Sequence, residues 1–235
     1  MSPSVVERAP ARCVEHAQRN ADLRLRTSAG PLRTRVWWPD TQEPGTAVGL
    51  LLFFADARDG RDTSEAWLRE LSSRAGLVIV SVPCAPIPDA VIREGVRDAT
   101  TALGWAADHA RELEADPGRL IVGGTGIGAA VAAAVAVDSA AARWPGIARQ
   151  LLIGLDLQGC VPLTLAAAPA GAAPATIVTF GHGGEGRWYA SRLRQASVDV
   201  EELHYDAPAG DDRLVRDLAR SLRFPATSRL APGIS

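Results

Sequence analysis

Five short apolar runs constrain the fold of this chain more than any other feature of its sequence. They occupy residues 48–54, 76–82, 120–123, 150–154 and 176–180. Uninterrupted apolar runs of this length are typical of strands buried on both faces, as in a parallel sheet. Between the runs, apolar residues recur at helical spacing, for example Trp67, Leu68 and Leu71. This alternation predicts an α/β fold with right-handed crossovers and helices on both faces of the sheet.

The N-terminal part follows a different pattern. Residues 23–26 and 32–36 alternate apolar and polar side chains, and a Ser-Ala-Gly-Pro turn separates them, which predicts an antiparallel hairpin. The length of 235 residues fits one domain, 1–235. We expect residues 1–20 to form an arm and residues 225–235 to be a disordered tail.

Composition excludes several classes of protein. The net charge is −2 and there is no long basic run, which argues against a nucleic-acid surface. No stretch approaches the roughly 20 apolar residues that span a bilayer, and the N-terminus lacks the apolar core of a signal peptide. Three cysteines, Cys13, Cys84 and Cys160, lack C-x-x-C spacing and favour free thiols. We therefore predict a cytoplasmic protein with no membrane or nucleic-acid partner.

Two motifs carry a family resemblance. Residues 116–128 read Asp-Pro-Gly-Arg-Leu-Ile-Val-Gly-Gly-Thr-Gly-Ile-Gly, and residues 96–105 end in Ala-Leu-Gly-Trp. Over residues 33–224 the chain resembles the hormone-sensitive-lipase-type branch of the α/β-hydrolases. The resemblance implies an α/β-hydrolase fold with about eight strands, mostly parallel and twisted, a leading antiparallel hairpin and helices on both faces. Because only residues 156–175 separate two strands, we expect the lid to be reduced or absent.

The resemblance also implies four catalytic devices, and the chain departs from them. We assign Thr125 to the nucleophile position of the strand-to-helix turn that holds a serine in the family. Residues 55–60, Ala-Asp-Ala-Arg-Asp-Gly, replace the His-Gly-Gly-Gly oxyanion loop, and a carboxylate there would repel an oxyanion. No histidine follows Tyr205, where the family has its general base. We therefore interpret the catalytic motifs as altered.

One hypothesis exchanges the residue types of two loops. His182 stands where the family has its acid, and Asp211 stands near the position of its histidine. Because both loops follow neighbouring strands, a Thr125–His182–Asp211 constellation is one arrangement to test. The alternative is that His182 is a loop residue and that Asp211 caps the helix that follows.

Asp56 is the other catalytic candidate. It could serve as a general acid or base in a rebuilt pocket, or it could belong to a solvated loop before a helix. The backbone N–H groups of Gly126 and Ile127 could bind an anion at a helix N-terminus. The remaining predicted substrate-binding residues are Ala55, Arg58, Gly124 and Cys84.

No cofactor or metal is expected. The four histidines are dispersed, and the glycine-rich turn follows at least two parallel strands, unlike a dinucleotide loop. We predict a non-hydrolytic enzyme that acts on a small organic molecule by cyclisation, elimination or isomerisation, in natural-product tailoring for example. The alternatives are a non-catalytic pseudo-hydrolase that binds a ligand or protein, and a weak esterase that uses Thr125, His182 and Asp211. Formation of a homodimer is left open.

Overall fold

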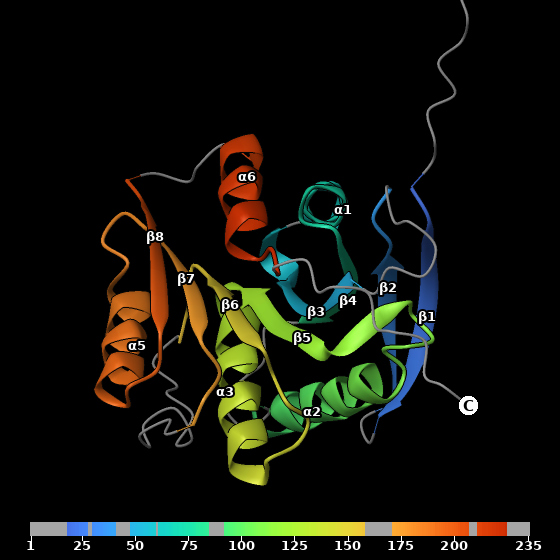
Figure 1. The fold of residues 1–235 in the computed structure, drawn as a ribbon, viewed down its shortest axis with the longest axis horizontal. Helices are drawn as coiled ribbons and strands as arrows, with labels where there is room; N and C mark the ends of the chain where they lie inside the picture. Colours follow the sequence, from blue (N-terminus) through green and yellow to red (C-terminus); the bar gives the residue numbers. More distant parts are fainter. Residues whose placement is uncertain are drawn as a thin grey trace, which may run out of the picture.

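A twisted sheet lies at the centre of the molecule, and its described part has eight strands in the order β1-β2-β4-β3-β5-β6-β7-β8 (Figure 1). The computed structural model describes residues 18–27, 30–40, 48–59, 61–84, 92–157, 171–206 and 211–224. Most of the predicted N-terminal arm, the predicted tail and the segment where a lid would be inserted lie outside the described residues, as do Cys13 and Cys160.

Strands and helices alternate after the N-terminal hairpin. The strands are β1 (Asn20–Thr27), β2 (Gly30–Trp37), β3 (Val48–Asp56), β4 (Leu77–Cys84), β5 (Ala115–Thr125), β6 (Arg149–Ile153), β7 (Ala175–Phe180) and β8 (Val200–Tyr205). The helices are α1 (Arg61–Ala75), α2 (Ile92–Asp108), α3 (Gly126–Ala142), α5 (Gly184–Gln195) and α6 (Asp211–Ser221), with a short 3-10 helix, η1 (Ala57–Asp59).

The pairing of the strands confirms the predicted fold class. β1 and β2 form an antiparallel hairpin, and β2 joins β4 in antiparallel register. From β4 to β8, all neighbouring strands are parallel. Strand β5 is longer than its apolar run of 120–123, because that run marks only the part that is buried on both faces.

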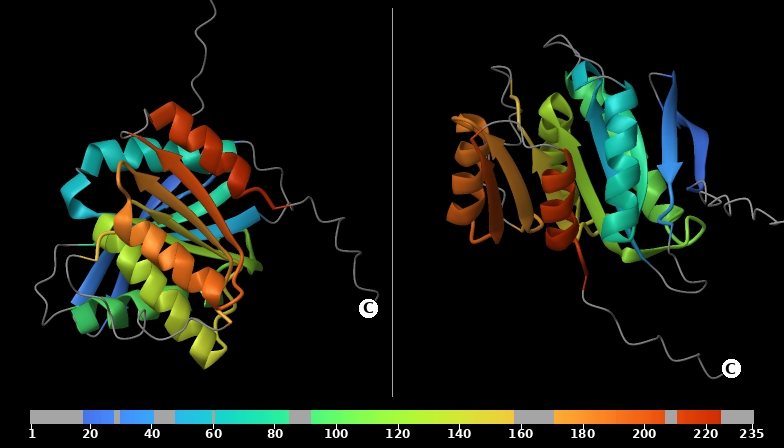
Figure 2. Two further views of the ribbon diagram at one scale, coloured as in Figure 1. Left: turned by 90° about the vertical axis from the view of Figure 1, so that its left-hand side faces the viewer. Right: turned by 90° about the horizontal axis from the view of Figure 1, so that it is seen from above.

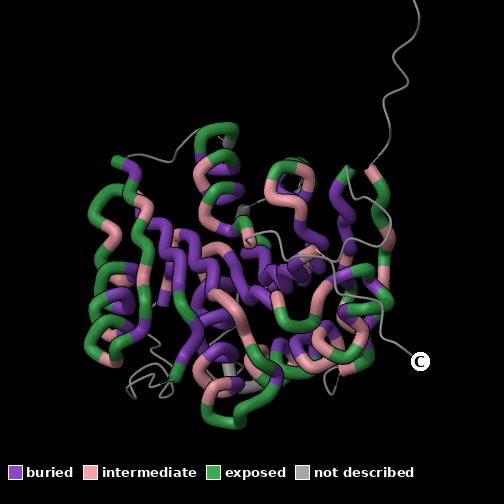
Figure 3. The backbone as a smooth tube through the Cα atoms, viewed as in Figure 1, coloured by how far each residue is buried: buried purple, intermediate pink, exposed green. Residues whose placement is uncertain are grey.

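Helices cover both faces of the sheet (Figures 1 and 2). Helices α1 and α6 lie on one face, where Leu68, Leu71 and Leu218 are fully buried. Helices α2, α3 and α5 lie on the other face, and the alanines of α3 pack against the sheet. Figure 3 shows the central strands as the most buried part of the chain. Within the described residues, no helix is long and apolar enough to cross a membrane.

This topology decides which residues can meet. Strands β3, β5 and β6 are parallel neighbours, so their carboxyl ends reach the same edge of the sheet. The segments that follow these ends begin at Ala57, Gly126 and Gly154. A ligand site in an open parallel sheet forms at such an edge.

Candidate functional site

The turn between β5 and α3 has a glycine at its tip. Thr125 has extended backbone angles (φ −110°, ψ 146°), whereas Gly126 has φ +53°. The nucleophile of an α/β-hydrolase occupies the strained position of this turn. The assignment of Thr125 to that position is therefore wrong, because the structure places Gly126 there.

The glycine-rich run explains the error. Its sequence holds one Gly-x-x-x-Gly spacing, from Gly124 to Gly128 with Gly126 at the centre, whereas a turn centred on Thr125 would end at Ile127. The structure uses the Gly124–Gly128 register, in which both glycines approach the backbone of β3. A Cβ atom on Gly124 would lie 2.6 Å from the carbonyl oxygen of Phe54, and one on Gly128 would lie 2.0 Å from it. Only glycine fits at these two contacts.

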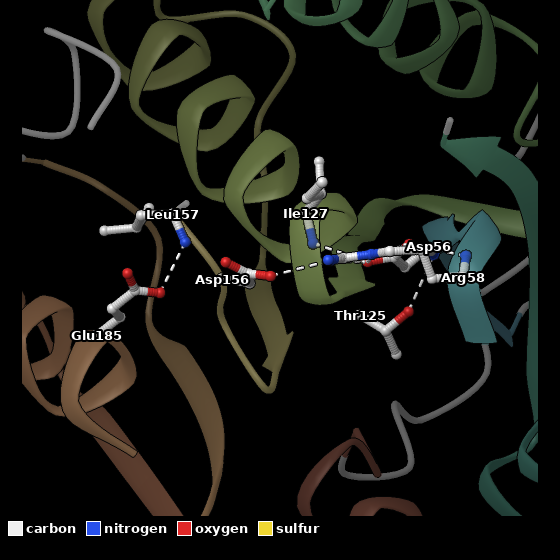
Figure 4. Close-up of polar contacts among 7 residues, drawn as sticks. All are labelled: Asp56, Arg58, Thr125, Ile127, Asp156, Leu157 and Glu185. Carbon is white, nitrogen blue, oxygen red and sulfur yellow. Dashed lines mark hydrogen bonds and ion pairs between the residues drawn. The ribbon is translucent and has the colours of Figure 1, made fainter. Parts of the chain in front are cut away.

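Thr125 has a structural contact instead. Its Oγ1 accepts a hydrogen bond of 3.0 Å from the backbone N–H of Asp56 (Figure 4). This bond ties the end of β3 to the end of β5. The Thr125 hydroxyl thus helps to hold Asp56 beside the turn.

The carboxylate of Asp56 fills the space at the tip. A Cβ atom on Gly126 would lie 2.4 Å from Asp56 Oδ2. The same oxygen accepts a hydrogen bond of 3.3 Å from the N–H of Ile127, in the first turn of α3, and the Asp56 side chain is only 2% exposed. The predicted anion site at Ile127 is therefore occupied by a carboxylate of the chain itself.

Arg58 neutralises this buried carboxylate. Its Nη2 lies 2.5 Å from Asp56 Oδ2, and its Nε lies 3.0 Å from both Asp56 oxygens. Burial opposes ionisation of Asp56, but the hydrogen bonds from Arg58 and Ile127 outweigh it and hold the pKa of Asp56 below its ordinary value. The pKa of Arg58 is raised, mainly by its bonds to Asp56 and Asp156. Both groups are charged at neutral pH.

Asp156 completes the cluster. Arg58 Nη2 also donates to Asp156 Oδ2 at 2.9 Å (Figure 4). The N–H of Asp156 donates to the carbonyl oxygen of Gly126 at 3.2 Å. The next residue, Leu157, is anchored by a 2.7 Å hydrogen bond from its N–H to Glu185. Sequence analysis missed Asp156, although its place just after a parallel strand was a usable signal.

Of the other catalytic candidates, His182 does not contact this cluster. His182 is exposed in the turn after β7 and makes no hydrogen bond to any described residue. Asp211 begins α6, but its side chain lies outside the described part of the chain; its neighbour Asp212 forms an ion pair with Arg74 of α1. The Thr125–His182–Asp211 constellation therefore finds no geometric support.

Two predicted substrate-binding residues lie close by. Cys84 pairs with Asp56 in the parallel register of β4 and β3. Burial raises the pKa of the Cys84 thiol to about 11, and the charge of Asp56 adds to this shift. The thiol is thus protonated at neutral pH and cannot act as a thiolate. Ala55 and Asp56 line a cavity of about 340 Å³ beside the cluster.

The site offers carboxylates and a guanidinium. No group of three or more His, Cys, Asp or Glu side chains that could hold a metal ion exists among the residues described. What the cluster can do chemically is donate hydrogen bonds from Arg58 and accept a proton on Asp156.

Comparison with known proteins identifies similar sequences. A family model described as alpha/beta hydrolase fold matches residues 58–158. Esterase LipI of Mycobacterium tuberculosis is 31% identical over 146 residues, which are 61% of this chain and 46% of LipI. Carboxylesterase NlhH of the same species is 29% identical over 119 residues, or 50% of this chain and 37% of NlhH. The chain thus spans less than half the length of these curated relatives.

Solved structures share the fold. An esterase of Pyrobaculum calidifontis superposes with a TM-score of 0.76 at 20% identity, covering 87% of this chain and 83% of that esterase. The metagenomic carboxylesterase EstE1 gives 0.74 at 22% identity, covering 88% and 90%. The sequence relatives named esterase and carboxylesterase contradict the prediction of a cyclase, lyase or isomerase in natural-product tailoring, and also that of a non-catalytic pseudo-hydrolase. The prediction relied on missing motifs, and the only hydrolytic alternative that it kept used Thr125, His182 and Asp211.

Proposed function

We propose that this chain, an α/β-hydrolase-fold protein of the hormone-sensitive-lipase-type esterase branch, hydrolyses small-molecule carboxylic esters without a covalent acyl-enzyme. The relatives named esterase and carboxylesterase support the reaction class. One observation supports the route: the tip of the turn carries Gly126, which has no side chain to attack an ester, and Arg58 and Asp156 lie beside it.

Arg58 supplies the electrophilic part of the proposed route. Its side chain is 42% exposed, and its Nη1 makes no hydrogen bond to any described residue. Nη1 can donate to the carbonyl oxygen of a bound ester and stabilise the negative charge that develops there. The Asp56 carboxylate holds the guanidinium at the tip through three contacts.

Asp156 supplies the base. Its side chain is 32% exposed, whereas that of Asp56 is only 2% exposed. Asp156 takes a proton from a water molecule while the water oxygen attacks the ester carbonyl carbon. The carbon–oxygen bond to the alcohol then breaks, and the proton passes from Asp156 to the leaving oxygen. The products are a carboxylic acid and an alcohol.

Hydrolysis of 4-nitrophenyl acetate by the purified chain tests this route. Asp156→Asn keeps an oxygen that can accept from Arg58 but removes the base, so kcat/KM should fall by about 100-fold. Asp108→Asn is the matched control, because Asp108 is exposed at the end of α2 and far from the cluster in sequence and topology. That variant should keep the wild-type kcat/KM within about twofold.

Covalent labelling provides the second readout. A fluorophosphonate probe reacts with an activated serine or threonine, so the wild-type chain should remain unlabelled. Labelling of the wild type, or equal activity of Asp156→Asn and Asp108→Asn, would contradict the route. Absence of hydrolysis above buffer with the acetyl, butyryl and octanoyl esters would contradict the function. Cytoplasmic location and a homodimer stay predictions.

A further inference from the structure

The cavity beside the cluster arises where two strands separate. Strand β2 pairs with β4 only from Arg35 to Trp37, opposite Ser81 to Ile79. If the pairing continued in this register, Arg33 would lie opposite Pro83, which has no backbone N–H to donate. On the N-terminal side of Arg35, β2 therefore pairs with β1 alone. The cavity of about 340 Å³ is lined by residues of β2 and of β4, the two strands that separate here.

The wall formed by the hairpin carries two cations that no described residue neutralises. Arg24 and Arg33 lie directly opposite each other in the β1–β2 register, and both are exposed. Neither forms an ion pair or hydrogen bond with a residue of the described ranges. The neighbouring Arg35 differs, because it contacts Asp22 and Glu65 at 2.6 Å each. Like charges placed directly opposite destabilise a sheet unless an anion lies between them.

The rest of the wall suits an apolar body. Leu23, Leu68 and Pro83 line the cavity, and its volume lies at the low end of the range for ligand pockets. Thr34 also lines it, is 4% exposed, and has an Oγ1 atom without a hydrogen-bond partner among the described residues. A ligand with one charged end and an apolar end of moderate size fits these walls.

We infer that this cavity binds a small-molecule carboxylate, with the carboxylate between Arg24 and Arg33 and the apolar part over Leu68 and Pro83. A monoanion is favoured over a phosphate dianion, because the carboxylates of Asp22, Asp56 and Glu65 also line the cavity. Asp56 links the cavity to the Arg58–Asp156 cluster. If the proposed hydrolysis holds, on which this last step rests, the preferred esters carry a free carboxylate as well.

Calorimetric titration of the full chain with octanoate tests the inference without relying on turnover. Octanamide is the neutral probe of the same length, and octanoate should bind at least about tenfold more tightly because charge-assisted hydrogen bonds are lost with the amide. The double variant Arg24→Gln/Arg33→Gln should lose about tenfold in octanoate affinity. Arg26→Gln is the matched control: Arg26 lies two residues from Arg24 in β1, is exposed, and does not line the cavity.

The possible outcomes separate clearly. Octanoate affinity that Arg26→Gln lowers as much as the double variant would show a general charge effect and overturn the inference. Equal affinity for octanoate and octanamide, tighter binding of inorganic phosphate, or no octanoate binding would also overturn it. Thermal unfolding checks that each variant folds, and relief of repulsion should leave the double variant no less stable. Hydrolysis of neutral 4-nitrophenyl acetate is measured in parallel, so that failure of binding and failure of the proposed function are seen independently.

Discussion

Replacement of Gly126 by alanine tests the central feature of the site, the carboxylate of Asp56 at the tip of the turn. The new Cβ atom would lie 2.4 Å from Asp56 Oδ2 and 3.4 Å from Arg58 Nη2. Asp56 is held from three sides, by Arg58, by the N–H of Ile127 and through its own N–H by Thr125. It cannot give way without losing some of these bonds.

Two contributions set the magnitude. Alanine at a left-handed position costs about 1–2 kcal/mol relative to glycine. Displacement of the carboxylate from Ile127 removes a hydrogen bond to a charged group, which is worth about 1.5–3 kcal/mol. We therefore expect Gly126→Ala to lower the free energy of unfolding by about 2.5–5 kcal/mol.

Urea denaturation of five chains, the wild type, Gly126→Ala, Gly76→Ala, Asp56→Ala and the Asp56→Ala/Gly126→Ala double variant, separates the two contributions. Gly76→Ala is the control for backbone cost, because Gly76 has φ +66° and a Cβ atom there would meet nothing within 4 Å. It should lose only about 1–2 kcal/mol. In an Asp56→Ala background the clash is absent, and Gly126→Ala should then cost no more than Gly76→Ala.

The double-mutant cycle can refute this reasoning. If Gly126→Ala costs the same with and without Asp56, the carboxylate does not occupy the tip. If Gly126→Ala in the wild-type chain lowers the free energy of unfolding no more than Gly76→Ala does, the loss comes from the backbone angle alone. Either result would contradict the placement of the Asp56 carboxylate at the tip, and with it the anchoring of Arg58 there.

Three further predictions concern the same region. Gly128→Ala should destabilise the chain by about 3 kcal/mol or more in urea, since its Cβ atom would lie 2.0 Å from the Phe54 carbonyl oxygen, and a loss below about 1 kcal/mol would contradict the close approach. Folding lowers the pKa of Asp56, so the unfolded chain binds this proton first, and the free energy of unfolding falls as the pH drops below the ordinary value of 3.8. In urea denaturation at pH 5 and pH 3, Asp56→Asn should therefore lose less free energy of unfolding between the two pH values than the wild type does. The pKa of Cys84 is raised from 9.0 to about 11, so the unfolded thiol ionises first and stability should fall as the pH rises across this interval, an effect that Cys84→Ala should abolish.

Much of the architecture follows from local pattern. Uninterrupted apolar runs were sufficient to predict the parallel sheet, because a strand buried on both faces needs apolar side chains at every position. Helical spacing was sufficient to predict buried helix positions such as Leu68 and Leu71. The hairpin followed from alternation in the same way. The length of β5 did not follow, since residues 116–119 lie where the register with β3 is interrupted and are partly or fully exposed.

The site required the tertiary structure. The sequence by itself determined that Asp56 and Arg58 follow one parallel strand and that a glycine-rich turn follows another. The spacing of Gly124 and Gly128 already favoured Gly126 as the tip, although the prediction centred the turn on Thr125. Only the tertiary structure gives the reason for this spacing, which is the approach of Gly124 and Gly128 to the backbone of β3, a contact between segments about seventy residues apart in the chain. The partnership of Arg58 with Asp156 was decided in the same way, because ion pairs depend on where separate strands end in space.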